Sequence, residues 1–210
     1  MSEKMTIKYI VFDFDGTMAD TFKDVLDIVN GLKTDKEVDV DMNDIKNYGI
    51  SGLMKRARIP LWKLPKLVKD VLFKLRKKTD IKLFPNMPQI LQELSRNYKL
   101  GIVSSNSSEN ISNVLRRYGI ADDFDFIYSS SSIFGKHLIL KNMCKKYKIK
   151  PVEILYVGDE NRDIIGARKA NIKTIAITWG YNSEKLLQKE NPEYLARTPE
   201  EILTILSAMT

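Results

Sequence analysis

The chain has 210 residues, of which 43% are hydrophobic, enough for one domain with an ordered core and a modest insertion. Its single cysteine, Cys144, excludes an internal disulfide, and its helical surroundings predict a buried structural thiol rather than a catalytic one. The first apolar run, Tyr9–Phe12, is too short for a signal peptide or a membrane span. We therefore expect a cytoplasmic protein that has no membrane partner.

The formal net charge of +7 is spread unevenly along the chain. Acidic residues dominate from Asp20 to Asp44, whereas from Lys55 to Lys82 only Asp70 and Asp80 oppose the basic residues. We interpret the basic stretch first as a solvated lysine face and second as a surface that attracts a phosphorylated substrate. Contact with nucleic acid is the least favoured interpretation.

Five short apolar runs, each followed by polar or glycine residues, predict the strands of a parallel sheet that is covered on both faces. Apolar residues at helical spacing separate the later four runs. This alternation predicts an α/β fold, a doubly wound, Rossmann-like parallel sheet. The runs are Tyr9–Phe12, Leu100–Val103, Phe124–Tyr128, Ile154–Val157 and Thr174–Thr178.

The gap between the first two strands, residues 13–99, is far longer than an ordinary crossover. Two stripes of apolar residues at helical spacing lie inside it, at 22–32 and 64–75, and prolines punctuate it. We predict a small helical cap inserted at 21–83, directly after the first strand. Residues 1–20 and 84–210 then form the core, which includes a helix at about Met87 to Tyr98.

Polar side chains follow three of the predicted strands, at the edge where open α/β sheets bind ligands. The segments are Asp13 to Thr17, Ser104 to Asn106 and Gly158 to Asp163. Carboxylates that gather at one edge repel one another and need a compensating cation. Hard oxygen ligands of this kind suit Mg²⁺, which also binds substrate phosphate. The sequence therefore predicts a magnesium site.

Phosphoryl transfer needs a nucleophile, a proton donor for the leaving group and neutralisation of charge. Asp13 has the chemistry of the nucleophile, and Asp15 that of the general acid and then base. Lys136, at the start of a predicted helix, is the candidate that offsets the charge of Asp13 and of the phosphate.

Four further residues are predicted to contact the phosphate group. Gly16 permits a tight turn, and Thr17 is placed to hydrogen-bond Asp15 or to cap the next segment. The Ser104 hydroxyl and the adjacent amide of Ser105 are placed to hold phosphate oxygens.

These segments resemble the motifs of the haloacid dehalogenase superfamily, in particular its phosphoglycolate-phosphatase-like members with a helical cap. The resemblance covers nearly the whole chain. It implies that Asp13, the Asp15 carbonyl and Asp159 hold Mg²⁺, that Asp163 supports the site, and that the cap closes over it as a lid. Ser104-Ser105 stands where Thr-Asn is commoner, and Lys136 lacks the usual following proline.

The resemblance implies a magnesium-dependent phosphatase that hydrolyses a small phosphate monoester, phosphoglycolate-like or a sugar phosphate, through an aspartyl-phosphate. Asp15 favours this reaction over dehalogenation, because a halide leaves without a proton whereas an alkoxide needs one. One alternative is a phosphotransferase or mutase on sugar phosphates, although the segment Ser51 to Arg56 matches the mutase pattern poorly. The other is a non-catalytic binding module that uses the basic cap face. A small phosphorylated metabolite is the expected partner, and the sequence leaves the oligomeric state open.

Overall fold

The computed structural model describes residues 6–31, 43, 46–48, 70, 73–75, 78, 80–130 and 135–209. Most of the predicted cap at 21–83 lies outside these residues, as do the segment Ser51 to Arg56 and most of the basic stretch from Lys55 to Lys82. The domain boundaries therefore stay a prediction.

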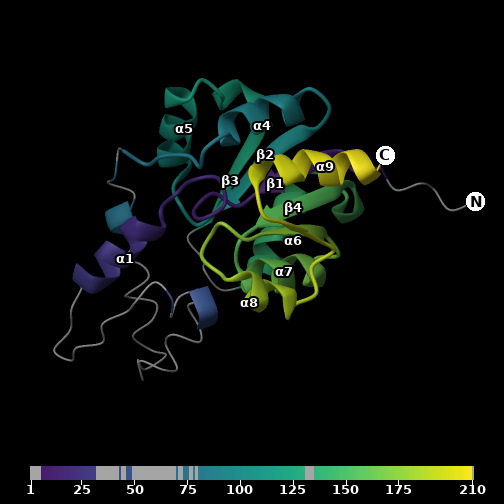
Figure 1. Ribbon diagram of the computed structural model, residues 1–210. Coiled ribbons are helices and arrows are strands. Elements are labelled where there is room, and N and C mark those ends of the chain that lie inside the picture. The colour runs from purple at the N-terminus through teal and green to yellow at the C-terminus, as the bar shows by residue number, and fades with distance from the viewer. Residues whose placement is uncertain are drawn as a thin grey trace, which may run out of the picture.

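The core is a six-stranded sheet in the order β3-β2-β1-β4-β5-β6, and every neighbouring pair of strands is parallel (Figure 1). The chain builds outward from β1 in both directions, so the sheet is doubly wound and β1 lies at the point where the direction reverses. The strands are β1 (Tyr9–Phe12), β2 (Lys99–Ser104), β3 (Phe124–Ser129), β4 (Ile154–Gly158), β5 (Lys173–Ile177) and β6 (Tyr194–Ala196).

Helices cover both faces of the sheet, as Figure 1 shows. One face is covered by α4 (Met87–Ser95), α5 (Ser108–Arg117) and α9 (Pro199–Met209). The other face is covered by α6 (Lys136–Tyr147), α7 (Asn161–Lys169) and α8 (Glu184–Gln188). The short 3₁₀ helices η2 (Ala121–Asp123) and η3 (Pro151–Glu153) lead into β3 and β4.

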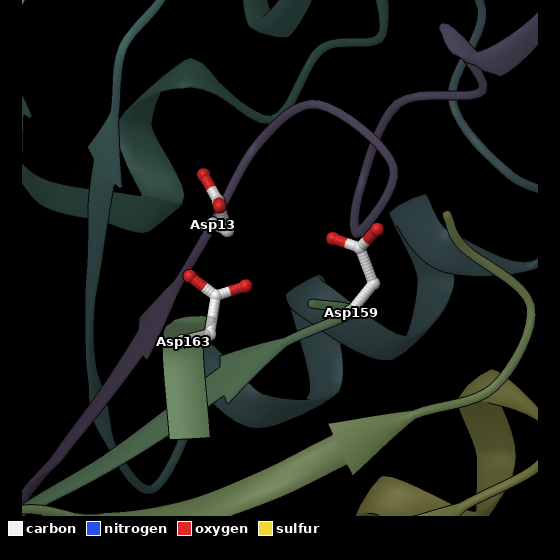
Figure 2. Close-up of side chains that lie close together, drawn as sticks. All are labelled: Asp13, Asp159 and Asp163. Carbon is white, nitrogen blue, oxygen red and sulfur yellow. The ribbon is translucent and has the colours of Figure 1, made fainter. Parts of the chain in front are cut away.

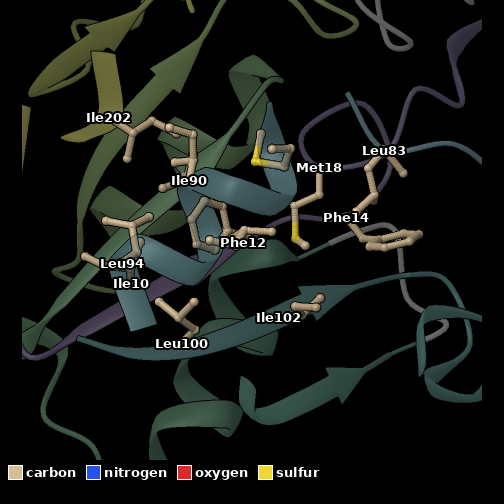
Figure 3. Packing of buried hydrophobic residues seen from close by; sticks show 14 of the residues in the cluster. Ile10, Phe12, Phe14, Met18, Leu83, Ile90, Leu94, Leu100, Ile102 and Ile202 are labelled. Atoms are coloured by element: carbon tan, nitrogen blue, oxygen red, sulfur yellow. The ribbon is translucent and has the colours of Figure 1, made fainter. Parts of the chain in front are cut away.

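Alternate residues of β1 supply the two cores. Ile10 and Phe12 point into the cluster beneath α4 and α9, where they meet Ile90 and Ile202 (Figure 3), whereas Val11 points to the opposite face. The side chains of Ile10, Val11 and Phe12 are fully buried. Burial of each one contributes roughly 1.5–3 kcal/mol to the free energy of folding. This burial on both faces fixes the position of the residue that follows β1.

The segments that leave and re-enter the core around the insertion lie side by side. Ala19 and Leu83 form an antiparallel bridge, and the Phe84 amide donates to the Met18 carbonyl at 2.9 Å. Helix α1 (Phe22–Gly31) starts directly after this pair, on the side of the molecule away from α9 (Figure 1).

The predicted doubly wound α/β fold is confirmed, and the five predicted strands agree with the structure to within two residues at each end. Cys144 is a buried free thiol, also as predicted. The short strand β6 and the helices α8 and α9 were not predicted. Within the described part of the chain, no helix is both long and apolar enough to cross a membrane.

Candidate active site

Asp13 directly follows β1 and is held at the carboxyl edge of the sheet. Its amide donates to the Val157 carbonyl at 2.9 Å, which continues the pairing with β4. Its carboxylate accepts from the Phe14 amide at 2.8 Å and from Lys136 Nζ at 2.9 Å, and the residue is only 5% exposed. Burial raises the pKa of Asp13, and Lys136 opposes that rise.

Three buried carboxylates meet at this edge, as Figure 2 shows: Asp13 after β1, Asp159 after β4 and Asp163 in the first turn of α7. One oxygen of each lies within 4.8 Å of one oxygen of the others. Burial, followed by the charges of Glu160, Asp163 and Asp13, raises the pKa of Asp159 well above its usual range.

The raised pKa indicates that the negative charge of Asp159 is unfavourable unless a cation lies nearby. Oxygen ligands so close together fit a small divalent cation, which would lower the same pKa. Asp13, Asp159 and Asp163 thus lie together at one edge of the sheet, as predicted, and their oxygens fit a divalent metal.

Lys136 is the first residue of α6, and it follows Gly135, whose φ of 79° turns the chain into the helix. Its ammonium lies 2.9 Å from Asp13 Oδ2 and 3.0 Å from Asp163 Oδ1. Burial lowers the pKa of Lys136, but Asp13 and Asp163 outweigh this effect, and the net shift is upward. The ammonium also lies 5.1 Å from the ring centroid of Tyr156, beneath it in β4. Lys136 is thus a fixed, charged bridge between two of the three carboxylates.

Asp163 is further held by the capping of α7, since its Oδ2 accepts from the Glu160 amide at 3.1 Å. The buried Glu160 carboxylate pairs in turn with the Arg162 guanidinium. The described residues of the site therefore carry an excess of formal negative charge. Four buried carboxylates face two cations, Lys136 and Arg162, and the carboxylates are those of Asp13, Asp159, Glu160 and Asp163.

Asp159 is fully buried, and its carboxylate accepts hydrogen bonds from two loops. The Thr17 hydroxyl donates to its Oδ1 at 2.6 Å, and the Tyr181 amide donates to its Oδ2 at 2.8 Å. The sequence had predicted that Thr17 hydrogen-bonds Asp15 or caps the next segment. The tight turn at Gly16, where φ is 80°, instead carries Thr17 over Asp159.

The Gly16 position gives the first prediction. A Cβ there would lie 2.4 Å from Asp159 Oδ2, whereas at Gly119, whose φ of 69° is equally left-handed, a Cβ would meet nothing within 4 Å. We expect Gly16→Ala to displace Asp159 and to raise the divalent-cation concentration that gives half-maximal cation binding by about tenfold or more. Gly119→Ala carries the same backbone strain and should leave that concentration unchanged. An equal response of the two variants would contradict the prediction.

Asp15 lies two residues beyond Asp13 and is half-buried. Burial and the charge of Asp13 raise the pKa of Asp15 to about 7, although hydrogen bonds from Asn106 and Thr21 oppose the rise. Asn106 Nδ2 lies 3.3 Å from both Asp15 oxygens, and Asn106 Oδ1 accepts from the Ser107 amide at 2.8 Å. The Asn106 amide group is thereby oriented with its donor toward Asp15. A carboxyl group with such a pKa can both give and take a proton near neutral pH.

Ser104 ends β2 at the same edge and is 3% exposed. Its hydroxyl accepts from the Asn106 amide at 3.0 Å, and the half-buried Ser105 lies between the two. The sequence predicted no role for Asn106 or for Tyr181. Both residues follow strands at the carboxyl edge, which is the signal that would have found them.

A doubly wound sheet whose carboxylates converge beyond β1 and β4, with a lysine between them, is typical of an α/β enzyme, and its acidic site fits a divalent metal. Residues 10–177 match the family model of the haloacid dehalogenase-like hydrolases. The chain belongs to this family, and the prediction of a hydrolase enzyme is confirmed.

Relatives of the chain include phosphatases. It is 32% identical over 206 residues to a phosphoglycolate phosphatase of Synechococcus elongatus, covering 95% of this chain and 97% of the relative. It is 28% identical to the pyrophosphatase PpaX of Oceanobacillus iheyensis, covering 96% and 98%. The crystal structure of a predicted phosphatase from Clostridium acetobutylicum superimposes with a TM-score of 0.79 at 20% identity, covering 96% and 99%, and shares the fold.

Proposed function

We propose that this protein is a cytoplasmic, magnesium-dependent phosphatase that hydrolyses a small phosphate monoester through an aspartyl-phosphate on Asp13. The observation that carries the proposal is the position of Asp13: a buried carboxylate that touches Lys136, belongs to a three-carboxylate group and lies two residues from Asp15. The phosphatases among the relatives support the same reaction class.

In the first step, an Asp13 oxygen attacks phosphorus as the bond to the leaving oxygen breaks, and Asp15 gives its proton to that oxygen. In the second step, Asp15 takes a proton from a water molecule whose oxygen attacks the phosphorus of the aspartyl-phosphate. This returns Asp13 as a carboxylate and releases inorganic phosphate. Lys136 balances the charge of Asp13 and of the incoming phosphate in both steps.

Asp13, the Asp15 carbonyl and Asp159 would hold the magnesium ion, with Asp163 in support. The bound ion would neutralise charge on the phosphoryl oxygens. Gly16, Thr17, Ser104 and Ser105 remain the proposed phosphate contacts, although the Thr17 hydroxyl is also engaged by Asp159.

A phosphoglycolate-like ester is the proposed substrate, because the relatives that match across most of this chain include phosphoglycolate phosphatases. A sugar phosphate is the next candidate. Pyrophosphate is also tested as a substrate, because one relative is the pyrophosphatase PpaX. We do not propose nucleic acid as a partner.

The test is release of inorganic phosphate from 2-phosphoglycolate, pyrophosphate, glucose 6-phosphate and p-nitrophenyl phosphate, with Mg²⁺ and with excess EDTA. We expect turnover of at least one monoester, and its loss in EDTA. A mutase would convert a sugar phosphate into an isomer without releasing phosphate, and a binding module would turn over nothing. Full activity in EDTA would remove the metal from the proposal.

The raised pKa of Asp15 predicts the pH dependence of the first step. Only the protonated carboxyl can protonate a leaving alkoxide, and its population falls tenfold per pH unit above a pKa of about 7. A bound cation nearby lowers this pKa, so we expect kcat/KM for 2-phosphoglycolate to decline from about pH 7 or below as the pH rises. A pH profile that stays flat up to pH 9 would contradict this role of Asp15.

A further inference from the structure

The segment that follows β5, residues 178–183, packs against the aspartate that follows β4. A Cβ at Gly180 would lie 2.3 Å from the Cβ of Asp159, so no larger side chain fits between the two backbones there. The Tyr181 amide donates to Asp159 Oδ2 at 2.8 Å, and the next amide, that of Asn182, donates to the Asp159 carbonyl at 3.3 Å. This close packing brings the Asn182 side chain against the turn between β4 and α7.

The Asn182 side chain is the acceptor for the first amide of α7. Its Oδ1 accepts from the Asn161 amide at 2.8 Å, and Asn161 is the first residue of that helix. The first amides of an α-helix have no partner within the helix, and here the acceptor comes from another loop. Because a backbone N–H can bond only to the oxygen of the side-chain amide, this contact also fixes the orientation of the Asn182 amide group.

Asn182 thereby holds the turn that separates Asp159 from Asp163 at two points. Its own amide bonds the carbonyl of Asp159, and its side chain bonds the amide of Asn161, two positions before Asp163. Asp159 and Asp163 both lie close to Asp13, as Figure 2 shows. The path of this turn therefore sets the distance between two of the three carboxylates.

The nitrogen of the Asn182 side chain is buried without a partner. Asn182 is 1% exposed, and among the described residues its Nδ2 meets no hydrogen-bond acceptor. A buried donor without an acceptor is unfavourable, so the useful half of this amide group is its oxygen. That oxygen is neutral, and it accepts the Asn161 amide without adding to the excess negative charge of the site.

We propose that Asn182 is a positioning residue for the divalent cation: its side-chain oxygen, through the Asn161 amide, holds the turn that places Asp159 and Asp163 beside one another. The inference rests on the proposed function, in which Asp159 holds the ion and Asp163 supports the site. The side-chain oxygen bonds a backbone amide rather than a carboxylate, so it acts on the ligands through the turn that carries them. Loss of this oxygen should therefore weaken cation binding.

The experiment measures binding of Mn²⁺, a divalent cation that also prefers oxygen ligands, to the metal-free full chain. Electron paramagnetic resonance follows the signal of the free ion during the titration. Asn182→Leu keeps a similar volume but removes the acceptor, and we expect it to raise the Mn²⁺ dissociation constant by about tenfold. Asn182→Asp keeps an oxygen for the Asn161 amide, and it should weaken Mn²⁺ binding by no more than about threefold.

Urea unfolding in EDTA, where no cation is bound, separates positioning from a merely structural role. A residue that only stabilised the fold would change the free energy of unfolding in EDTA and leave the Mn²⁺ affinity of the folded chain as it was. Asn182→Ala is the second variant, because it removes the same oxygen without placing a branched side chain beside the turn. We expect it to show the same loss of affinity as Asn182→Leu.

The matched control is Asp125→Leu, which removes the side-chain acceptor of another backbone amide, that of Leu100, at 3.0 Å. Leu100 lies near the start of β2, at the other edge of the sheet, so Mn²⁺ binding should not change. Wild-type affinity in Asn182→Leu and Asn182→Ala, or an equal loss in Asn182→Asp, would overturn the inference and leave the proposed function intact. A wild type that binds no Mn²⁺ would overturn the inference, and one that also hydrolyses no phosphate ester would overturn the proposed function with it.

Discussion

Replacing Asp13 by asparagine is expected to abolish turnover, because the amide cannot attack phosphorus and cannot carry the phosphoryl group. We expect phosphate release to fall by about a thousandfold or more, which corresponds to roughly 4 kcal/mol of lost transition-state stabilisation. In the wild type, acid quenching during turnover followed by mass spectrometry should find one phosphoryl group on the peptide that contains Asp13. A variant that kept a tenth of the wild-type rate, a deficit of about 1.4 kcal/mol, would exclude Asp13 as the nucleophile.

The same substitution should leave the fold intact. Asparagine retains an oxygen that can accept from the Phe14 amide, and Lys136 keeps Asp163 as its partner. It also removes one of the buried charges that repel each other, so the free energy of unfolding should stay the same or rise. Asp122→Asn, at an exposed aspartate in η2, is the matched control and should retain full activity. An unfolded Asp13→Asn variant would contradict this separation of stability from catalysis.

The fold was predictable because strands buried on both faces leave a plain signal in the sequence. Val11 and Phe12 serve opposite faces of the sheet, so the β1 run is apolar throughout rather than alternating. β6 has only three residues, Tyr194–Ala196, of which two are partly exposed, and so short a segment carries no pattern.

The acidic side chains of the site were predictable for a topological reason: parallel strands end at one edge, so residues that follow β1 and β4 must be neighbours. The hydrogen-bond partners of the residues around the site were not predictable. Thr17 binds Asp159 across 142 residues of sequence, and Thr21 meets Tyr181 across 160. Such pairings depend on the path of each loop above the sheet edge, which local propensity does not determine.

The substitution Lys136→Met should damage both activity and stability, since it removes the cation that bridges Asp13 and Asp163. Methionine fills a similar volume but leaves two buried carboxylates without their partner. Breaking a buried ion pair from one side costs about 3 kcal/mol or more, and we expect a loss of that order in the free energy of unfolding at pH 8. We also expect activity to fall by about a hundredfold or more, because charge on the phosphoryl group is no longer balanced.

The loss of stability should depend on pH in a defined direction. Without Lys136, the pKa of Asp13 in the folded state rises further above its value in the unfolded chain. A group whose pKa is raised by folding favours the folded state in acid and loses that contribution as the pH rises. Urea unfolding should therefore show a smaller difference between Lys136→Met and the wild type at pH 5 than at pH 8. Lys141→Met, at an exposed lysine of the same helix, should show almost no difference at either pH. If the deficit of Lys136→Met were instead the same at both pH values, the buried carboxylates would not be the groups that Lys136 stabilises.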